Sequence, residues 1–599
     1  MLFSLLFLST IAVACCSLAR GALYTDPSAL PQTTYDFVIV GGGTAGNVLA
    51  NRLSEILSFS VLVIEAGPSY TAVFADEVPF LDMTLTPDTS ITWNYTTTEQ
   101  SNLDNRIITY PRGRVLGGSS VVNLLVWTRG SEDDYNRLAA ATGESGWGWN
   151  SMLDYMMKSE DLVPPSDHMD TAGKVDSSVH GTNGPIHISL EGYPVNIDQR
   201  IIGMTNLTPP VFDYVEDMNA GFPIGLGWSQ SAIGTNGHRS DSATGYLDPV
   251  LSRSNLDVLV ETTVTKLISN GTQDDEPVFT TIQMAQSSTS QIYTVHASKE
   301  IILSAGSINT PQLMMLSGIG DSATLKSLAI ESIVHSPGVG QNLIDHPLIT
   351  NNWLVNSTNT NDEYARNATL AAEALAQWNA TGTGPFVDNN AEQIGWARVP
   401  ESIFQQYGDP SAGQNSPNLE FIIANAWASW TQPRPATGNY LTVLTVVVSP
   451  GSRGAVTLAS NSIWDMPLID PGYFSDPFDI AAMVHAINMS KTFVQGPTWE
   501  GYVIGPVPEL AAAQTYEELE AYARNQVTTI WHPVGTARMP ANSSDVEAVV
   551  TSELLVKGAS GLRVVDASVF PYIPAAHPQA PLYALAERAA DLIKAAWGV

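Results

Sequence analysis

Short apolar segments and a glycine-rich turn alternate at the start of the chain. Residues 35–40, Tyr-Asp-Phe-Val-Ile-Val, are rich in β-branched side chains and predict a buried strand. A glycine-rich turn follows at residues 41–46, and residues 47–55 place their apolar side chains at helical spacing. Residues 61–64 predict a second buried strand, which ends at Glu65. Strand, turn, helix, strand and acid in this order predict a βαβ unit, the first part of a Rossmann-like domain.

Later apolar segments predict that the chain returns to the same sheet. We expect strands at residues 262–268, 300–304 and 562–565, the last of which leads into Asp566. A final helix is predicted from residue 582 to about residue 597, because apolar and polar side chains alternate there at helical spacing behind a proline. No internal repeat or heptad pattern is present.

Three intervening segments lack a periodic apolar pattern. Residues 160–195 are rich in Pro, Asp, Ser and Gly, residues 350–385 in Asn, Thr and Ala, and residues 427–440 carry Trp, Pro and Gly. They predict long loops or insertions that belong to a second domain or cover a pocket. The predicted fold class is therefore α/β (α+β overall), with a Rossmann-like domain interleaved with a second domain. We expect the first domain to comprise residues 35–150, 230–345 and 545–599, and the second to comprise residues 151–229 and 346–544.

Composition narrows the range of partners. The chain has 599 residues, of which 44% are hydrophobic and 14% charged, as in a globular protein large enough for two packed domains. Asp and Glu outnumber Lys and Arg by 59 to 26, which gives a formal net charge of −33. A field of this sign repels phosphate backbones and anionic lipid headgroups. We therefore expect neither nucleic acid nor a membrane surface as a partner.

The N-terminus indicates export from the cell. Residues 1–21 combine an apolar run with small residues at a possible cleavage point, which predicts a secretory signal peptide. Both cysteines, Cys15 and Cys16, lie in this segment, so the mature chain would contain no disulfide and no thiolate metal site. Eight sequons predict glycosylation, at Asn94, Asn206, Asn270, Asn356, Asn367, Asn379, Asn488 and Asn542. The predicted localisation is secreted and extracellular.

The first turn has the pattern of a dinucleotide-binding loop. Its glycines let the backbone turn tightly and approach a pyrophosphate, which would lie at the positive end of the following helix. An acid at the end of the second strand would bind the ribose hydroxyls of the adenosine half and would repel a 2′-phosphate. The predicted contacts are Gly41, Gly43, Thr44, Ala45, Gly46 and Glu65. This unit alone leaves NAD and FAD both open.

Four further segments carry a family resemblance. Residues 113–123, 306–320, 532–539 and 565–577 resemble, in order, signature segments of the glucose–methanol–choline (GMC) oxidoreductases. The resemblance extends from residue 35 to the C-terminus. It implies that the Rossmann-like domain binds FAD and that the second domain, built on an antiparallel sheet with helices, covers the isoalloxazine ring.

The resemblance also implies which residues contact the flavin. Members of the family place Asn or His near the reactive edge of the flavin, where this chain has Asn123. Members with covalently bound flavin carry a histidine immediately before that position, where this chain has Val122. The expected cofactor is therefore non-covalent FAD. Further cofactor contacts are expected at Val115, Gly118, Ser119, Val264, Asp566, Ala567 and Gln579.

Two histidines are the candidate catalytic residues. Alcohol oxidation requires removal of the hydroxyl proton while hydride leaves the adjacent carbon, and a neutral imidazole is a suitable general base. His532 and His577 both precede proline in rigid settings, and in similar enzymes such a pair faces the flavin. The resemblance implies that His532 is the base for hydride transfer to flavin N5 and that His577 hydrogen-bonds the alcohol oxygen. The other histidines show no metal-ligand spacing, so no metal site is predicted.

Within the family, the sequence is most similar to fungal aryl-alcohol oxidases. Residues 93–100, 180–184 and 433–435 resemble segments of those enzymes, and an aromatic wall suits a flat benzylic alcohol. The predicted substrate contacts are Tyr95, Leu124, Trp430 and Trp531. Two departures concern this site. Aryl-alcohol oxidases have histidine where this chain has Asn123, a residue that sugar-oxidising relatives carry, and tyrosine where it has Leu124.

These features together predict a secreted, monomeric flavoenzyme. It would oxidise primary alcohols, aromatic or allylic ones foremost, to aldehydes, and O2 would reoxidise the flavin and yield H2O2. One alternative is a glucose or pyranose oxidase, or a dehydrogenase that uses another electron acceptor. The alternative from a different class is a lyase or binding protein that has the fold but no redox activity, which the retention of both histidines disfavours.

Overall fold

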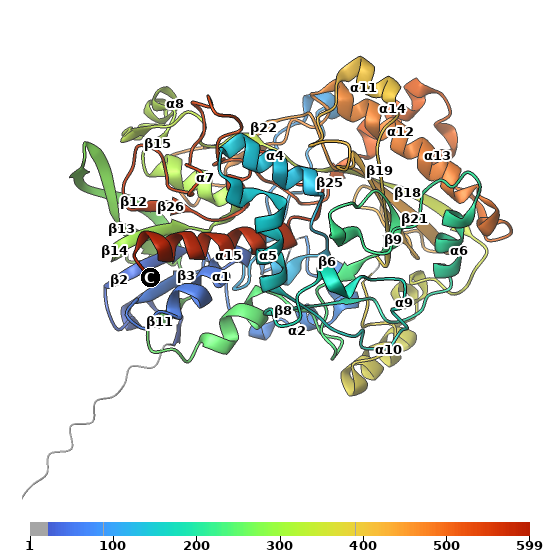
Figure 1. Cartoon of the computed structure of the whole chain (residues 1–599), viewed down its shortest axis with the longest axis horizontal. Coiled ribbons are helices and arrows are strands. Elements are labelled where there is room, and N and C mark those ends of the chain that lie inside the picture. Colours follow the sequence, from blue (N-terminus) through green and yellow to red (C-terminus); the bar gives the residue numbers. More distant parts are fainter. Residues whose placement is uncertain (1–21, 88, 390) are drawn as a thin grey trace, which may run out of the picture.

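The helices and strands are arranged around two large sheets, which lie in the left and right halves of Figure 1. The computed structural model describes residues 22–87, 89–389 and 391–599. The predicted signal peptide, with Cys15 and Cys16, lies outside the described residues. Among the described helices, none is long and apolar enough to cross a membrane.

The first sheet contains the predicted βαβ unit. Its strands, in spatial order, are β1 (Leu23–Tyr24), β11 (Leu256–Leu259), β3 (Val61–Ile64), β2 (Thr34–Val40), β14 (Tyr293–Leu303), β13 (Glu276–Ala285) and β12 (Thr263–Gln273), with β26 (Leu562–Val564) beside β14. The strands from β1 to β14 and β26 pair in parallel, whereas β13 and β12 continue the sheet antiparallel. The core strands β2 and β3 are buried on both faces, which explains their nearly continuous apolar sequences.

Helices cover the face of this sheet beside the glycine-rich turn. Helix α1 (Thr44–Ser54) follows the turn and packs on β2 and β3. Helix α15 (Gln579–Ala596) packs against α1, and α5 (Trp149–Ser159) packs against α15. Figure 1 shows α15, in red, lying across the left half of the molecule with α5 beside it. The C-terminal helix therefore begins earlier than predicted, with its proline accommodated in the first turn.

The second sheet is antiparallel throughout. Its strands, in spatial order, are β24 (Val503–Pro506), β18 (Pro347–Val355), β21 (Tyr440–Val447), β20 (Leu419–Ala424), β19 (Gln393–Ala397) and β9 (Gly225–Trp228), with β25 (Thr528–Thr529) beside β18. Alternate side chains of β20 point to opposite faces. Phe421 and Ile423 join the apolar core beneath helix α12 (Pro477–Val494), whereas Ile422 and Ala424 line a cavity.

The remaining elements connect or cover the two sheets. The helices are α2 (Phe74–Glu77), α3 (Ser119–Val122), α4 (Glu132–Thr142), α6 (Asp198–Gly203), α7 (Gly306–Leu316), α8 (Ser322–Ser327), α9 (Asp362–Arg366), α10 (Ala368–Thr381), α11 (Glu401–Tyr407), α13 (Pro508–Ala512) and α14 (Tyr516–Gln526). The strands are β4 (Thr92–Trp93), β5 (Arg112–Gly113), β6 (Val126–Trp127), β7 (Glu160–Leu162), β8 (Ile186–Leu190), β10 (Gln230–Ser231), β15 (Ile319–Gly320), β16 (Val334–His335), β17 (Gln341–Leu343), β22 (Gly454–Thr457) and β23 (Leu468–Asp470).

The predicted fold class is confirmed, and one predicted loop is wrong. Residues 350–385 contain most of β18 together with α9 and α10. The polar residues that indicated a loop have structural roles here, because the Asn367 side chain caps α10 by accepting hydrogen bonds from the N–H groups of Thr369 and Leu370. Residues 427–439 are irregular, as predicted, and 160–195 contain only short elements such as β7 and β8.

The two sheets draw on interleaved parts of the chain. The strands of the second sheet all fall within residues 225–529, and those of the first lie within residues 23–303 and 562–564. The first sheet thus gains its last strand, β26, after the second sheet is complete. The exact domain boundaries stay a prediction.

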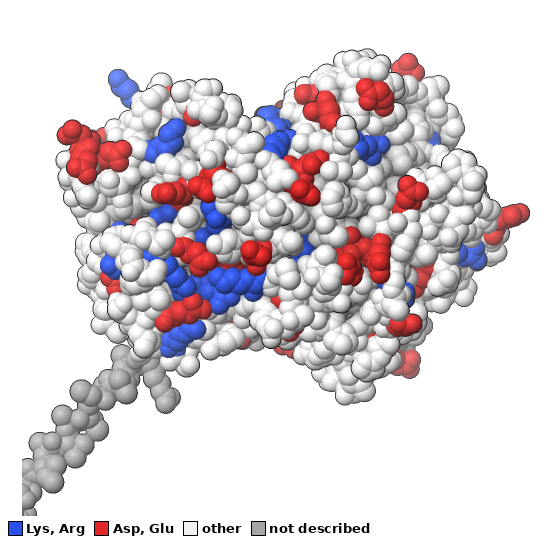
Figure 2. Space-filling view, viewed as in Figure 1, with Lys and Arg blue, Asp and Glu red and all other residues white. Residues whose placement is uncertain are grey.

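Charged side chains of both signs occur on the surface despite the large negative net charge. Figure 2 shows the largest basic group in the left half, over the first sheet and its helices. Two cations beside α15 are paired: Glu587 of this helix accepts hydrogen bonds from Arg52, with an N–O distance of 2.7 Å, and lies 3.0 Å from Lys158 Nζ. Pairing of this kind lowers the attraction of these two cations for an external anion.

Candidate active site

Two adjoining cavities lie between the first sheet and the second. The larger has a volume of about 660 Å³ and the smaller of about 150 Å³. Residues that line both cavities include Thr44, Ser119, Ala567 and Leu582, so the two spaces are neighbours along a shared wall. A ligand with two distinct parts therefore fits this arrangement.

The smaller cavity is built by the predicted dinucleotide-binding residues. The turn between β2 and α1 contributes Gly41, Gly43, Thr44 and Ala45, which places the N-terminus of α1 at the cavity. The lining also includes Glu65, Gly118, Ser119, Val264, Asp566 and Ala567, all of them predicted. Backbone N–H groups and a helix N-terminus favour a bound pyrophosphate.

Two glycines bring the turn close to its neighbours. Gly41 has φ +105°, and a Cβ atom there would lie 2.4 Å from the backbone oxygen of Ser304. A Cβ at Gly46 would lie 2.0 Å from the backbone oxygen of Gly41. Gly46 was predicted as a cofactor contact, but it lies outside the lining. It acts instead by letting α1 pack closely on the turn.

Glu65 is held at the end of β3 by backbone hydrogen bonds. Its Oε2 accepts from Gly42 N at 2.9 Å and its Oε1 from Gly67 N at 2.8 Å. Burial raises the pKa of Glu65 to about 7, even though these hydrogen bonds oppose the shift. Each carboxylate oxygen retains a lone pair, so the residue can also accept hydrogen bonds from ribose hydroxyls.

The larger cavity offers polar groups to a flavin ring. Asn123 donates through Nδ2 to Gln579 Oε1, and its Oδ1 accepts from Arg239 Nη1 at 2.6 Å. The Nε2 atom of Gln579 is buried and has no hydrogen-bond partner among the described residues. A buried donor without an acceptor is costly, by about 1 to 3 kcal/mol. The amide therefore suits a ligand that presents acceptor atoms there, as the edge of an isoalloxazine ring does.

Both candidate catalytic histidines line the larger cavity and face each other. The ring centroids of His532 and His577 are 4.7 Å apart, with an interplanar angle of 70°. His532 follows β25, and its backbone N–H donates to Asp345 Oδ1 at 2.8 Å. His577 immediately precedes α15, and its backbone N–H donates to Thr128 Oγ1 at 2.8 Å. The predicted pair is thus assembled from two separate loops.

A third histidine, which sequence reasoning missed, contacts the first. His346 Nδ1 lies 3.0 Å from His532 Nδ1, and His346 is fully buried. Burial, followed by the nearby His577 and His346 rings and Arg112, holds the pKa of His532 well below its ordinary value. Burial lowers the pKa of His346 to about 3. Both rings are therefore neutral near pH 7.

The second catalytic candidate has a carboxylate partner that was also missed. His577 Nε2 lies 2.8 Å from Oε1 of Glu420, which is fully buried in β20. Since a carboxylate only accepts, this contact places a proton on Nε2. The second sheet thereby orients a histidine that belongs to the C-terminal segment.

A sequence signal for His346 does exist. Only three of the ten histidines precede proline, namely His346, His532 and His577, and these three are the ones that meet in the structure. Proline restricts the backbone of the residue before it to extended conformations, which stiffens the segment that presents each ring. The His-Pro dipeptide at residue 346 could therefore have been grouped with the other two.

Aromatic and aliphatic side chains form the walls of the larger cavity beyond the histidines. Trp430 and Trp531, both predicted, meet edge to face with centroids 5.1 Å apart. Leu124, also predicted, lines the same space. Further apolar lining residues are Phe80, Leu81, Val122, Tyr364, Leu375, Phe386, Ile422, Trp427, Leu444 and Ile530.

Two predicted contacts lie elsewhere. Tyr95 is buried away from the larger cavity, where its hydroxyl is hydrogen-bonded with Asn309 and its ring stacks on Trp93. Its prediction as a substrate residue is therefore wrong. Val115 packs in an apolar cluster with residues such as Leu85 and lines neither cavity, so its side chain does not contact a ligand there.

The predicted sequons differ in exposure. Seven of the eight asparagines are exposed at the surface, namely Asn206, Asn270, Asn356, Asn367, Asn379, Asn488 and Asn542. Asn94 is half-buried, and its Nδ2 donates to the backbone oxygen of Thr89 at 3.3 Å. Glycosylation stays a prediction, and Asn94 is the least accessible of the sites.

Sequence comparison finds one family along most of the chain. Residues 35–348 and 450–586 match the N-terminal and C-terminal family models of GMC oxidoreductases. A dehydrogenase of Hericium erinaceus, eriK, is 39% identical, and the match covers 98% of each chain. A pyranose dehydrogenase of Agaricus xanthodermus is 36% identical, over 97% of this chain and 96% of that protein.

Comparison with solved structures finds oxidases of the same fold. A variant of formate oxidase from Aspergillus oryzae, studied for FAD modification, superposes with a TM-score of 0.86 at 29% identity, over 95% of this chain and 99% of that one. A fungal aryl-alcohol oxidase superposes with a TM-score of 0.83 at 27% identity, over 94% of this chain and all (100%) of the other.

Proposed function

Because the chain belongs to the GMC oxidoreductase family, whose structural relatives are FAD-dependent, we propose that it is a secreted enzyme that oxidises aromatic or other apolar primary alcohols to aldehydes. The main observation behind this proposal is that aromatic side chains line the cavity beside the paired histidines. Secretion is supported by the apolar N-terminal segment and the exposed sequons.

The residues of both cavities fit the two parts of FAD. The turn after β2, Glu65 and Asp566 would hold the adenosine diphosphate part, and Asn123 with Gln579 would border the isoalloxazine ring. When bound, FAD supplies the hydride acceptor for alcohol oxidation. We propose that its attachment is non-covalent, since Val122 offers no nucleophile at the position where covalent members carry histidine.

His532 is proposed to take the hydroxyl proton of the alcohol. Its Nδ1 is occupied by His346, which leaves Nε2 as the ring nitrogen for the substrate. A general base needs a lone pair on that nitrogen, so the proton of the neutral ring must be on Nδ1, and His532 must donate to His346 Nδ1. His346 then acts as an acceptor that selects the reactive tautomer of His532.

His577 is proposed to position the same hydroxyl. Glu420 holds its Nε2, and when Nδ1 also carries a proton the ring can donate to the alcohol oxygen, whose single hydroxyl proton goes to His532. The two rings lie close enough to contact one hydroxyl group from two sides. Holding the hydroxyl in this way lowers the entropic cost of reaching the reactive geometry.

The rate of flavin reduction should depend on pH through His532. Its pKa is lowered below the ordinary value of 6.5, so the ring is a neutral base above that value and becomes protonated only under more acidic conditions. We therefore expect the anaerobic reduction rate to be constant from about pH 9 to pH 6.5 and to fall at lower pH. Stopped-flow reduction over this range measures the profile. A midpoint at or above 6.5 would contradict the assignment.

The shape and chemistry of the larger cavity favour an apolar substrate. Trp430 and Trp531 stand beside the histidine pair, and Phe80 stacks on Phe386 at 4.3 Å farther along the wall. A pyranose carries a hydroxyl on nearly every ring carbon, and these hydroxyls would lose hydrogen bonds to water among such walls. Sugar oxidation is the second candidate function, and three observations favour it: the pyranose dehydrogenase relative, Asn123, and polar lining residues such as Arg434.

Anaerobic bleaching of the flavin absorbance separates the two substrates. We expect p-methoxybenzyl alcohol to reduce the flavin at least 100-fold faster than glucose at equal concentration, since about 3 kcal/mol separates a well-packed from a mismatched substrate. Faster bleaching by glucose would support sugar oxidation. No bleaching by any alcohol would support the alternative that the fold serves a non-redox function.

The electron acceptor is a separate part of the proposal. We propose O2 as the oxidant, with release of H2O2, and the two structural relatives reported above are named oxidases. The two sequence relatives are named dehydrogenases, which favours an organic acceptor as the alternative. The two acceptors are distinguished by measuring, in the same preparation, the release of peroxide in air and the reduction of a quinone under nitrogen.

A further inference from the structure

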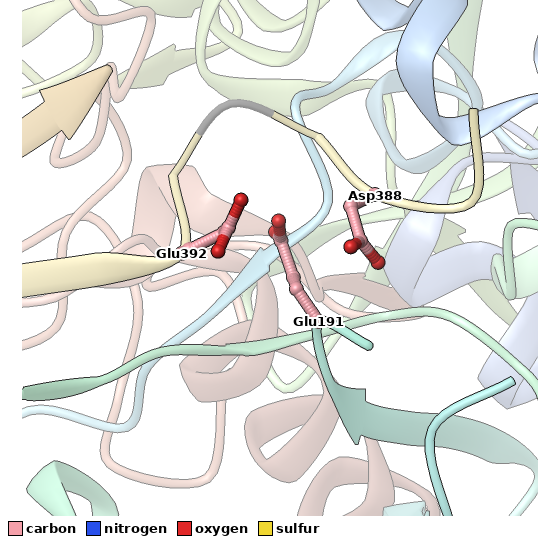
Figure 3. A group of neighbouring side chains, drawn as sticks. All are labelled: Glu191, Asp388 and Glu392. Atoms are coloured by element: carbon pink, nitrogen blue, oxygen red, sulfur yellow. The ribbon is translucent and has the colours of Figure 1, made fainter. Parts of the chain in front are cut away.

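Three buried carboxylates meet behind the wall of the larger cavity. Glu191 follows β8, and Asp388 and Glu392 lie in the segment before β19. One carboxylate oxygen from each residue lies within 4.8 Å of the others, and all three residues are buried. Figure 3 shows the Glu191 carboxylate between those of Asp388 and Glu392. The cluster joins parts of the chain that are nearly 200 residues apart in sequence.

The hydrogen bonds of the cluster leave one oxygen without a partner. Asp388 accepts from Gly192 N at 3.0 Å and from Tyr193 N at 2.6 Å. Glu191 Oε1 accepts from Ser231 Oγ at 3.0 Å. Glu191 Oε2, in a residue that is only 2% exposed, has no hydrogen-bond partner among the described residues. A buried carboxylate oxygen with no donor is costly, so this atom requires either a shared proton or a bound cation.

Further acidic side chains lie around the cluster. Asp198 and Asp82 lie near Glu191, and Asp198 is hydrogen-bonded with Glu392. The positive charge of Lys174 offsets part of the negative charge of Asp198. The cluster as it stands therefore needs either protons or a cation.

We propose that Glu191, Asp388 and Glu392 bind a divalent cation of the Ca²⁺ class. Hard cations prefer carboxylate oxygens, and Ca²⁺–oxygen distances of about 2.3 to 2.6 Å place opposite ligands about 4.8 Å apart. The three carboxylate oxygens lie within 4.8 Å of one another, close enough to contact one such cation together. Mg²⁺ demands a near-ideal octahedron and usually keeps several of its waters, so a buried site built of protein carboxylates suits it less well.

The site would fix part of the substrate wall. Asn389 and Ala391, between the two ligand residues, line the larger cavity. Asn389 Nδ2 donates to the backbone oxygen of Leu124 at 2.9 Å and to Ser231 Oγ at 3.0 Å, and Ser231 in turn donates to Glu191. A bound cation would therefore hold this segment against Leu124 without contacting the substrate.

Metal analysis of the holoenzyme tests the site directly. Elemental analysis after dialysis against metal-free buffer should find about one Ca²⁺ per chain. Removing it with EGTA should lower the Tm, and adding CaCl2, but not MgCl2, should restore it. Calorimetric titration of the EGTA-treated holoenzyme with CaCl2 should show one binding event. No bound metal, together with a Tm that is indifferent to EGTA and CaCl2, would overturn the proposal.

Substitutions localise the cation. Glu191→Gln and Glu392→Gln should each lose the bound Ca²⁺ and the effect of CaCl2 on Tm. The matched control is Asp479→Asn in α12, a buried carboxylate that also accepts backbone hydrogen bonds, from Gly451 and Ser452, but lies outside the cluster. This control should retain the metal. Retention of Ca²⁺ in both Glu variants would overturn the assignment, and if neither variant folds, the titration of the unaltered holoenzyme decides.

Discussion

Replacing His532 with alanine should slow anaerobic flavin reduction by about 100- to 10,000-fold while FAD stays bound, because a positioned general base contributes rate factors of this size. His532 is a neutral imidazole and has one ring nitrogen free for the substrate. Its loss leaves the hydroxyl proton without an acceptor. Stopped-flow measurement of the flavin absorbance with saturating alcohol gives the rate, and the absorbance spectrum of the purified variant reports bound FAD.

The control for this variant is a histidine outside the cavities. His485 lies in α12 and is half-buried, so His485→Ala removes a ring of equal size from the other side of the second sheet. This variant should reduce its flavin at the unaltered rate. If His532→Ala kept that rate as well, His532 would have no part in proton transfer. If it lost its FAD, the residue would instead be part of the cofactor site.

Replacing Gly46 with alanine should remove most of the bound FAD. The new Cβ would lie 2.0 Å from the backbone oxygen of Gly41. Relieving this clash would require the turn or the start of α1 to move, and that would change the shape of the smaller cavity. Overpacking of this kind costs about 3 kcal/mol, which corresponds to about 100-fold weaker FAD binding. The ratio of flavin to protein absorbance after gel filtration measures the loss, and the Tm of the variant measures the accompanying destabilisation.

A second glycine provides the matched control. A Cβ at Gly505 in β24 would meet nothing within 4 Å, so Gly505→Ala adds the same methyl group without a clash. This variant should keep its full complement of FAD. Full flavin content in Gly46→Ala would show that the turn is more adaptable than its packing implies, and that the glycine is not required for the cofactor.

Local patterns predicted the nucleotide-binding half of the protein. The strands β2 and β3, the glycine turn and the start of α1 are contiguous in sequence, and buried parallel strands leave a nearly continuous apolar signature. The residues predicted around the smaller cavity therefore lie where expected, apart from Gly46, which acts through packing, and Val115, which lies in an apolar cluster. Residues 350–385 were predicted as a loop because asparagine and threonine favour turns, although here one asparagine begins a helix and others lie in β18.

The sequence by itself determined which residues could act in catalysis and cofactor binding. These are the histidines before proline and the glycines of the turn. Only the tertiary structure decided their partners. His346 and Glu420 reach His532 and His577 from segments more than 150 residues away, and Glu191 meets Asp388 across a similar separation. Tyr95 occurs in a segment that resembles an active-site motif but packs behind the cavity. The reason is physical: hydrogen bonding and burial depend on distance in space, and an interleaved fold brings together residues that carry no shared local pattern.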